Sequence, residues 1–286
     1  MTHAPAPAPA PEPDPALDLA GLRDLAVRMA TEAGALVRDG RPERVEVAAT
    51  KSSAVDVVTR MDAASEELLR RILATERPDD AVLGEEGGST AGTSGLTWVL
   101  DPIDGTVNYL YGVGPYAVSV AVVTGAPDPA RWTVLAGAVH DVPGARTWSA
   151  ARGAGATLDG APLAPRPAAE LATSLVGTGF GYVAERRAAQ ARVLAQVLPR
   201  VRDVRRLGSA AVDLCLVASG ALDLYYERGL NPWDMAAGAL VAQEAGLVVT
   251  GLRGASATAQ MTVAGRPGTV EELVRILEEA DADQGA

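Results

Sequence analysis

The sequence is poor in the residues that form disulfides and soft-metal sites. Its 286 residues include one cysteine, Cys215, and two histidines, His3 and His140. A single cysteine excludes an internal disulfide, and its place in the apolar run 212–217 predicts a small buried side chain. One histidine outside the N-terminal segment excludes a histidine-rich zinc or iron site and disfavours a Ser-His-Asp triad. We therefore interpret His140, which follows a strand-like apolar run, as structural.

Long apolar runs are also missing. No stretch of eighteen apolar residues exists, so the sequence predicts no membrane span. Residues 1–16 are nearly all alanine and proline, and we expect them to form a disordered tail. This tail lacks the basic start and apolar core of a secretory signal, and cysteine is scarce, so we expect a cytoplasmic protein.

Basic residues are fewer than acidic residues, 25 against 36, so the net charge is −11. Proteins that bind nucleic acid show a basic face or stripe, so this balance makes nucleic acid an unlikely partner. The few arginine clusters (70–71, 186–187 and 202–206) are interpreted as solvated helix and strand faces. The chain has a single lysine, Lys51, among 25 basic residues. Its presence is due either to chance or to a need for a compact ammonium group.

Periodicity predicts an α/β protein. The first half, residues 17–160, is expected to be α+β, and the second half, residues 161–286, α/β. Expected helices cover 22–36, ending at Gly40, and the region around 68–73. Strands are expected at 45–47, 55–59, 81–83, 97–100, 116–123, 131–139 and 145–150, with a Gly/Ser/Thr loop at 87–95. The second half alternates strands at 175–179, 204, 222–226, 247–250 and 261–264 with helices at 183–198, 210–219, 233–245 and 269–280.

The segment 98–108, Trp-Val-Leu-Asp-Pro-Ile-Asp-Gly-Thr-Val-Asn, carries the strongest chemical signal. An apolar strand ends at Asp101, Pro102 prevents further pairing, and Asp104 follows three residues later. Two carboxylates can converge there beside the exposed N–H groups of Gly105 and Thr106. Such an arrangement suits hard cations that hold a phosphate, although an Asp-capped turn would use the same residue types.

This segment resembles the D-P-x-D-G-T-x-N signature of the inositol monophosphatase family. The family's second signature, W-D-x-A-A-G, is matched at 233–238, and its Gly-Glu-Glu element at 84–86. A K-S-S-x-x-D-x-V-T-x-x-D pattern is matched at 51–62, and the likeness continues through 207–211 and 225–227. Several elements in the family's order, covering residues 17 to about 280, make this resemblance specific. It implies a layered αβαβα fold, a homodimer and inhibition by lithium.

The resemblance also implies a magnesium site, with two to three Mg²⁺ ions and Mn²⁺ as an alternative cation. Glu85, Asp101 and the carbonyl of Ile103 correspond to ligands of the first ion. Asp101, Asp104 and Asp234 correspond to ligands of the second. Glu85 would also orient a water near a weaker third position. Asp234 has a second role open to it, as a cap at the start of an apolar helix.

The remaining site residues follow from the same resemblance. Thr106 and Asp62 correspond to the pair that positions or activates the nucleophilic water, which gives Thr106, Asp62 and Glu85 as catalytic residues. Glu227 corresponds to a glutamate that contacts substrate hydroxyls, although it can also be read as an exposed loop acid. Ser209 is a helix N-cap candidate that could also face the substrate. The full expected substrate-binding set is Lys51, Asp104, Gly105, Thr106, Ser209, Ala210 and Glu227.

These observations indicate Mg²⁺-dependent hydrolysis of a small phosphorylated polyol, with myo-inositol monophosphate as the expected substrate. Uncatalysed phosphate-monoester hydrolysis is extremely slow, and paired cations about 4 Å apart can stabilise its entering and leaving oxygens. Histidinol phosphate, fructose 1,6-bisphosphate and adenosine 3′,5′-bisphosphate remain alternative substrates. A non-enzymatic alternative is a regulatory protein that binds RNA or the transcription machinery.

Overall fold

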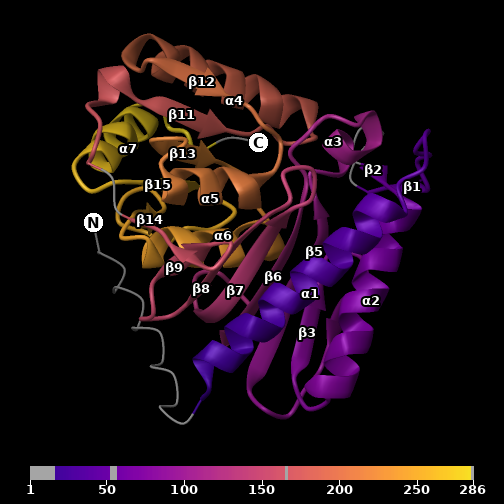
Figure 1. Cartoon of the computed structure of the whole chain (residues 1–286). Helices are drawn as coiled ribbons and strands as arrows, with labels where there is room; N and C mark the ends of the chain where they lie inside the picture. The colour runs from indigo at the N-terminus through magenta and orange to yellow at the C-terminus, as the bar shows by residue number, and fades with distance from the viewer. Residues whose placement is uncertain (1–16, 52–56, 165–166, 285–286) are drawn as a thin grey trace.

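The computed structural model describes residues 17–51, 57–164 and 167–284, so the predicted tail at 1–16 lies outside the described residues. Five layers of helices and sheets follow one another across the molecule (Figure 1). They are α1 (Leu19–Asp39) with α2 (Arg60–Glu76), a first sheet, α5 (Ala210–Ser219) with α6 (Pro232–Glu244), a second sheet, and α4 (Ala184–Val197) with α7 (Thr269–Glu279). This arrangement confirms the predicted αβαβα fold.

The first sheet has eight strands in the described part of the chain and is mostly antiparallel, with one parallel pair, β3 and β5. In spatial order its strands are β10 (Ala161–Pro162), β9 (Ala156–Leu158), β8 (Arg146–Ala151), β7 (Thr133–Asp141), β6 (Ala117–Thr124), β5 (Leu96–Asp104), β3 (Ala81–Gly84) and β4 (Gly88–Thr90). The central strands β5, β6 and β7 are buried along almost their whole length. A sheet covered on both faces needs such continuous apolar strands.

The second sheet is smaller and mixed. Its order is β12 (Asp203–Arg205), β11 (Leu175–Thr178), β13 (Leu224–Glu227), β15 (Thr262–Gly265) and β14 (Val248–Thr250). Strand β11 is parallel to both β12 and β13, so the carboxyl ends of β11 and β13 lie side by side. Ligand sites of α/β proteins form outside such carboxyl ends.

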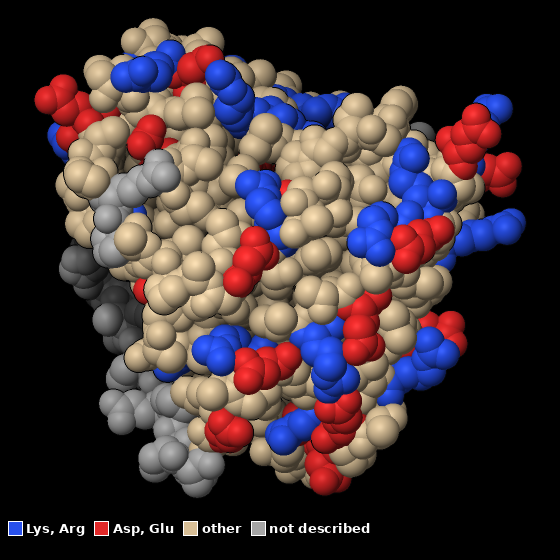
Figure 2. All heavy atoms as spheres, viewed as in Figure 1, with Lys and Arg blue, Asp and Glu red and all other residues tan. Residues whose placement is uncertain are grey.

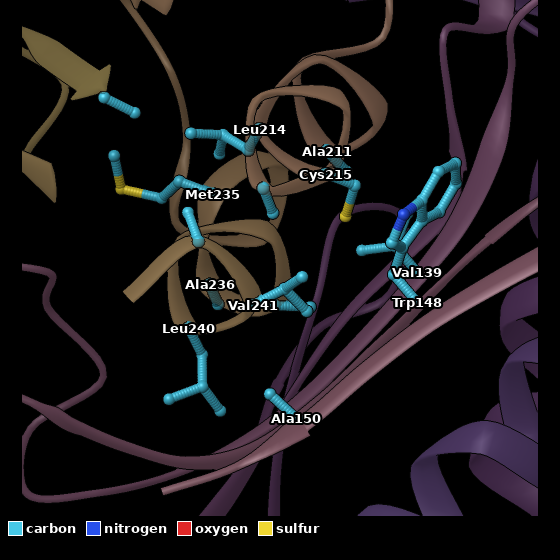
Figure 3. Close-up of a cluster of buried hydrophobic side chains, with 14 of the residues drawn as sticks. Val139, Trp148, Ala150, Ala211, Leu214, Cys215, Met235, Ala236, Leu240 and Val241 are labelled. Atoms are coloured by element: carbon cyan, nitrogen blue, oxygen red, sulfur yellow. The ribbon is translucent and has the colours of Figure 1, made fainter. Parts of the chain in front are cut away.

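The middle helix layer is rich in alanine. Both helices pack against strands of the first sheet, and both also contact strands of the second. Figure 3 shows side chains of α5 and α6 meeting Val139, Trp148 and Ala150 of the first sheet. Cys215 is fully buried in this cluster, and its small side chain faces the strands, as the sequence analysis predicts. Small residues allow both helices to approach the sheets closely.

The outer helix α1 shows how the sequence positions an element. Its apolar residues recur at helical spacing and are buried on the first sheet, and Asp18 caps its first turn. A Cβ at Gly34 would lie 2.2 Å from the His140 ring, so this glycine lets α1 pack against β7. The ring itself is hydrogen-bonded to Thr147 Oγ1 at 2.9 Å. These contacts are structural, in agreement with the interpretation of His140.

Three local predictions differ from the structure. Residues 45–47 form no strand, and the short hairpin nearby pairs β1 (Ala49–Thr50) with β2 (Val57–Val58). Part of the expected strand at 55–59 lies outside the described residues. The expected loop at 87–95 contains β4, which pairs with β3 although its residues are exposed, so it lacks an apolar signal. The six-residue helix α3 (Thr106–Tyr111) is not predicted, because it follows a glycine and is too short to show an apolar period.

Charges of both signs are mixed on the surface. Figure 2 shows basic and acidic side chains next to each other over the face that carries α1 and α2, where Arg28 contacts Glu32 and Glu76. No helix among the described residues has the length and apolar character needed to cross a membrane.

Candidate active site

A cleft of about 540 Å³ opens where the first sheet, the middle helices and the ends of β11 and β13 meet. Ten of the residues singled out from the sequence line it: Lys51, Glu85, Asp101, Ile103, Asp104, Gly105, Thr106, Ala210, Glu227 and Asp234. Asp62 and Ser209 lie behind this lining, and both are buried. Segments far apart in the sequence therefore contribute to one site.

Three carboxylates form the centre of the cleft. Asp101 and Asp104 come from the end of β5, and Asp234 comes from the first turn of α6. Oxygens of all three lie within 4.8 Å of one another. An irregularity in the pairing of β5 with β6 falls between Asp101 and Asp104, and it turns both side chains to the same place. Asp101 Oδ1 also accepts a hydrogen bond from Ile103 N at 3.0 Å, which fixes the turn between them.

Burial of these acids has a large electrostatic cost. It raises the pKa of Asp101 and of Asp234 well above the usual range, and neighbouring carboxylates raise both further. Burial also raises the pKa of Asp104 to about 6 and that of Glu85 to about 7. Like charges held together without water favour the neutral form, and a cation between them would reverse that preference. An all-oxygen donor set of this kind fits Mg²⁺ or Mn²⁺ better than zinc.

Asp104 is held from the C-terminal half of the chain. Its Oδ2 accepts hydrogen bonds from Ser209 Oγ at 2.6 Å and from Ala211 N at 2.7 Å. Ser209 is the N-cap of α5, where its hydroxyl also accepts from Val212 N. The structure therefore gives Ser209 the capping place and directs its hydroxyl at a carboxylate of the cleft.

Asp234 combines two roles. Its Oδ2 accepts a hydrogen bond from Asn231 N at 2.7 Å, in a capping box at the start of α6. A carboxylate in a first helical turn is favoured by the helix dipole. The local sequence thus fixes Asp234 in one orientation, and that orientation points its remaining lone pairs at Asp101 and Asp104.

Glu85 lies beside the three aspartates and is engaged by Lys51. Lys51 Nζ donates to Glu85 Oε1 at 2.7 Å and to Glu86 Oε1 at 2.6 Å. Partial burial disfavours the charged form of Lys51, but the two glutamates outweigh this effect and raise the pKa of the ammonium group. The lone lysine of the chain therefore reaches the cleft and balances the acids that follow β3.

Thr106 and Asp62 form the pair that the sequence predicts. Thr106 Oγ1 donates to Asp62 Oδ1 at 3.0 Å, and it lies 3.1 Å from the Ile103 carbonyl oxygen. The other oxygen, Asp62 Oδ2, accepts from the backbone N–H and the hydroxyl of Thr59. Burial raises the pKa of Asp62, and the hydrogen bonds from Thr59 and Thr106 oppose that rise. Asp62 is thus a fixed, buried acceptor behind the hydroxyl of Thr106.

Gly105 is required by the backbone that precedes Thr106. Its φ is +96°, and a Cβ there would lie 3.0 Å from Gly208 O and 3.1 Å from Pro115 O. This conformation starts α3 immediately after β5. The turn leaves the N–H groups of residues 105 and 106 at the lining of the cleft.

Glu227 ends β13 on the other side of the cleft. Its Oε2 accepts a hydrogen bond from the Tyr225 hydroxyl at 2.6 Å. Burial raises its pKa to about 7, and nearby Asp104 adds to the rise. Gly179, at the end of β11, makes room for it, since a Cβ there would lie 1.9 Å from Glu227 Oε2. Glu227 is therefore a half-buried group at the end of a strand in the cleft, and the reading as an exposed loop acid is wrong.

Three arginines that line the cleft, Arg186, Arg206 and Arg228, are not among the site residues predicted from the sequence. Arg186 and Arg206 had been assigned to solvated faces, yet both line the cleft. Arg206 acts on the acids around it and opposes the raised pKa of Asp104, Asp213 and Glu227. Arg206 and Arg228 each follow a strand end directly, which is a positional signal, whereas Arg186 lies in the first turn of α4 and has no such signal.

Fold and site together define a metal-dependent phosphatase that acts on small phosphorylated compounds. The chain belongs to the inositol monophosphatase family, whose sequence profile matches residues 18–282. It is 45% identical over 278 residues to an inositol-1-monophosphatase of Mycobacterium bovis, covering 91% of this chain and 94% of the relative. It is also 34% identical over 266 residues to a protein named Nus factor SuhB of Pasteurella multocida, covering 91% and 97%.

The fold has solved counterparts. Mycobacterium tuberculosis SuhB superimposes with a TM-score of 0.78 at 45% identity, covering 93% of this chain and 98% of that structure. Thermotoga maritima IMPase superimposes with a TM-score of 0.80 at 27% identity, covering 92% and 98%.

Proposed function

We propose that this protein hydrolyses myo-inositol monophosphate to inositol and phosphate in a Mg²⁺-dependent reaction. The observation that carries the proposal is the convergence of Asp101, Asp104 and Asp234 within 4.8 Å, beside Glu85 and the Thr106–Asp62 pair. The family acts on small phosphorylated substrates, and the Mycobacterium bovis relative carries the name of this activity.

The ligand set for the cations is Glu85, Asp101, the Ile103 carbonyl, Asp104 and Asp234, with two to three Mg²⁺ or Mn²⁺ ions per site. When bound, such cations neutralise the charge of the phosphate and make a water molecule more acidic. The raised pKa values of the four carboxyl groups support the assignment, because they mark a place built to receive positive charge.

The chain's own residues would position the attacking water. In the proposed arrangement the water donates a hydrogen bond to Thr106 Oγ1, while the Thr106 hydroxyl donates to Asp62 Oδ1. Because Thr59 holds the second oxygen of Asp62, the carboxylate cannot rotate, and the direction of the Thr106 hydroxyl is set. Glu85 would orient the same water from the opposite side. General-base assistance of this kind contributes typically 10²–10⁴-fold to rate.

The substrate would lie between the metal ligands and the ends of β11 and β13. The N–H groups of Gly105 and Thr106 would hold phosphate oxygens, and Asp104 and Glu227 would accept hydrogen bonds from ring hydroxyls. The backbone at Ala210 and the hydroxyl of Ser209 complete the wall, and Lys51 would cover the phosphate from the β1 side. A half-buried acceptor such as Glu227 suits a polyol, since an unpaired hydroxyl or carboxylate in a closed site is costly.

The decisive experiment measures phosphate release from myo-inositol 1-phosphate while Mg²⁺ is titrated. Asp101→Asn should lower kcat at least a thousand-fold, and EDTA should abolish the activity of the unaltered protein. The exposed Asp79→Asn is the matched control and should leave the rate within two-fold. Hydrolysis that resists both EDTA and Asp101→Asn would refute the proposal.

Other phosphate esters remain candidate substrates within the same chemistry. Histidinol phosphate, fructose 1,6-bisphosphate and adenosine 3′,5′-bisphosphate would use the same metal ligands. A substrate panel that contains all four esters, assayed at equal concentration, ranks them by kcat/KM. If inositol phosphate were a poor substrate and another ester a good one, the substrate assignment would fall while the metal assignment stayed.

A regulatory role is the second candidate, and the relative named Nus factor SuhB favours it. Binding of RNA or of the transcription machinery would be tested by affinity capture with the inactive Asp101→Asn protein. The mixed charges in Figure 2 provide no continuous basic stripe on the face shown, which argues against nucleic acid as a direct partner. We further propose a cytoplasmic homodimer that lithium inhibits.

A further inference from the structure

Arg186 is a cleft-lining cation without a partner among the described residues. It lies in the first turn of α4 and lines the same cleft as the three aspartates. Its Nε is buried and has no hydrogen-bond partner, and no ion pair to it is present in the described part of the chain. Buried polar groups are nearly always paired, so an orphaned guanidinium nitrogen in a cleft needs an explanation.

The position of Arg186 follows from two adjacent strand ends. Gly179 follows β11 and Glu227 ends β13, and their close approach places the Glu227 carboxylate in the cleft. Two residues further along each segment stand Gly181 and Gly229. A Cβ at Gly181 would lie 2.9 Å from Arg186 Cδ, and a Cβ at Gly229 would lie 2.7 Å from Arg186 Nη1. The two glycines therefore form a slot for this side chain, one step beyond Glu227.

A purely structural role explains this arrangement poorly. A cation in the first turn of a fourteen-residue helix is disfavoured by the helix dipole, and Val183, the N-cap, provides no side-chain cap. The neighbouring Arg187 behaves as a surface arginine: it is exposed, does not line the cleft, and donates to Gly181 O at 3.3 Å. Arg186, in contrast to Arg187, lines the cleft.

We propose that Arg186 binds a second phosphate of the substrate, one that is not cleaved and is attached to the polyol or sugar part. The planar guanidinium provides paired donors that match phosphate geometry. Glu227 would accept hydroxyl hydrogen bonds, and Arg186, one step further along both strand ends, would read a phosphate beyond them. This inference rests on the proposed function and extends its substrate class from monophosphorylated to bisphosphorylated polyols or sugars.

The test compares two substrates that differ in one phosphate, myo-inositol 1-phosphate and myo-inositol 1,4-bisphosphate. Arg186→Gln should raise KM for the bisphosphate about ten-fold with little change in kcat, and should leave both constants for the monophosphate within two-fold. Arg186→Lys should fall between, because it keeps the charge and loses the paired donors. Arg187→Gln is the matched control and should leave KM and kcat unchanged for both substrates. Equal effects on both substrates, or none on either, would overturn the inference.

A binding measurement separates this inference from the proposed function. Calorimetry in an Asp62→Asn background with Mg²⁺ reports affinity without turnover. In that background, Arg186→Gln should weaken binding of the bisphosphate about ten-fold and binding of the monophosphate less than two-fold. If the unaltered protein hydrolysed neither ester, the proposed function would fail, and the binding ratio would still decide the role of Arg186. Retained melting temperature in Arg186→Gln shows that the fold is intact.

Discussion

Ser209 Oγ donates to Asp104 Oδ2 at 2.6 Å and joins the N-terminus of α5 to the carboxyl end of β5. Asp104 ends a strand of the first sheet, and Ser209 caps a helix of the middle layer. This hydrogen bond therefore connects the two halves of the chain at the cleft. The same carboxylate oxygen also accepts from Ala211 N. The orientation of Asp104 in the cleft is therefore fixed by a helix N-terminus.

Ser209→Ala should weaken Mg²⁺ binding about ten-fold, because groups that orient a ligand typically contribute 10–100-fold to metal affinity. The substitution also removes the N-cap of α5, which should cost about 1 kcal/mol of the free energy of unfolding. Mg²⁺ titrations of activity and denaturant unfolding measure the two effects separately. Ser219→Ala, at the other end of α5, tests for a general loss of helix stability. An unchanged Mg²⁺ requirement in Ser209→Ala would contradict the orienting role.

Thr106→Val should lower kcat by about 10²–10³-fold, since it removes the hydroxyl that would link the attacking water to Asp62. The KM for substrate should change little, because the N–H of residue 106 remains. Thr106→Ser keeps the hydroxyl and should retain most of the activity. Steady-state kinetics with saturating Mg²⁺ distinguish these results. A large loss in the serine variant as well would show that the methyl group, and not the hydroxyl, matters.

The pH response of stability should depend on bound cations. Burial raises the pKa of Asp104 to about 6 and that of Glu85 to about 7, and those of Asp101 and Asp234 are raised further above their usual range. An unfolded carboxyl group titrates near pH 4, so the metal-free folded state binds more protons than the unfolded state above that pH. Its stability should therefore fall as pH rises from about 4 to about 7.

Melting temperatures in EDTA across this range measure the slope, and saturating Mg²⁺ should flatten or reverse it. For the same reason, the apparent affinity for Mg²⁺ should weaken as pH falls below about 7, because protons and cations compete for the same carboxylates. A metal-free protein whose melting temperature rises steadily between pH 4 and 7 would be at odds with the buried cluster. Asp104→Asn should reduce the slope.

Gly179→Ala should impair substrate binding while sparing the metal site. The added Cβ would lie 1.9 Å from Glu227 Oε2 and must displace that carboxylate, together with its hydrogen bond from Tyr225. The KM for myo-inositol 1-phosphate should rise at least five-fold, and the Mg²⁺ requirement should stay unchanged. Gly114→Ala, where a Cβ would meet Pro143 at an ordinary contact distance of 3.4 Å, is a control for alanine substitution outside the cleft lining. A changed Mg²⁺ requirement in Gly179→Ala would show that Glu227 and the aspartates move together.

Much of the fold was predictable because its signals are local. The apolar periods of α1, β6 and α7 match elements that bury one or both faces, and Gly40 ends the first helix where the sequence indicates. Strands β4 and β1 were not predictable from pattern, because their residues are exposed and only pairing with a neighbour makes them strands, whereas β2 falls inside the strand expected at 55–59. Tertiary contact decides such segments.

The site residues also fall into those that local sequence predicts and those that only tertiary contacts place. Residues inside compact motifs, such as Asp101, Asp104 and Thr106, could be named because their spacing is itself the signal. Arg186 could not, because its place depends on two glycines, one of which lies far along the chain on another segment. The sequence also left Ser209 open between a cap and a substrate contact, and only the distance to Asp104 shows which group its hydroxyl meets.

The alanine-rich middle layer has a consequence for how such an enzyme can diversify. Helix α6 holds Asp234, and its apolar residues belong to one buried cluster that includes strands of both sheets, so a bulkier side chain there would disturb the packing of both sheets. The ends of β11 and β13 lead into loops that carry no such double constraint. Changes in preferred substrate are therefore expected to accumulate in the segments 179–186 and 227–231, while the chemistry of the aspartates is inherited unchanged.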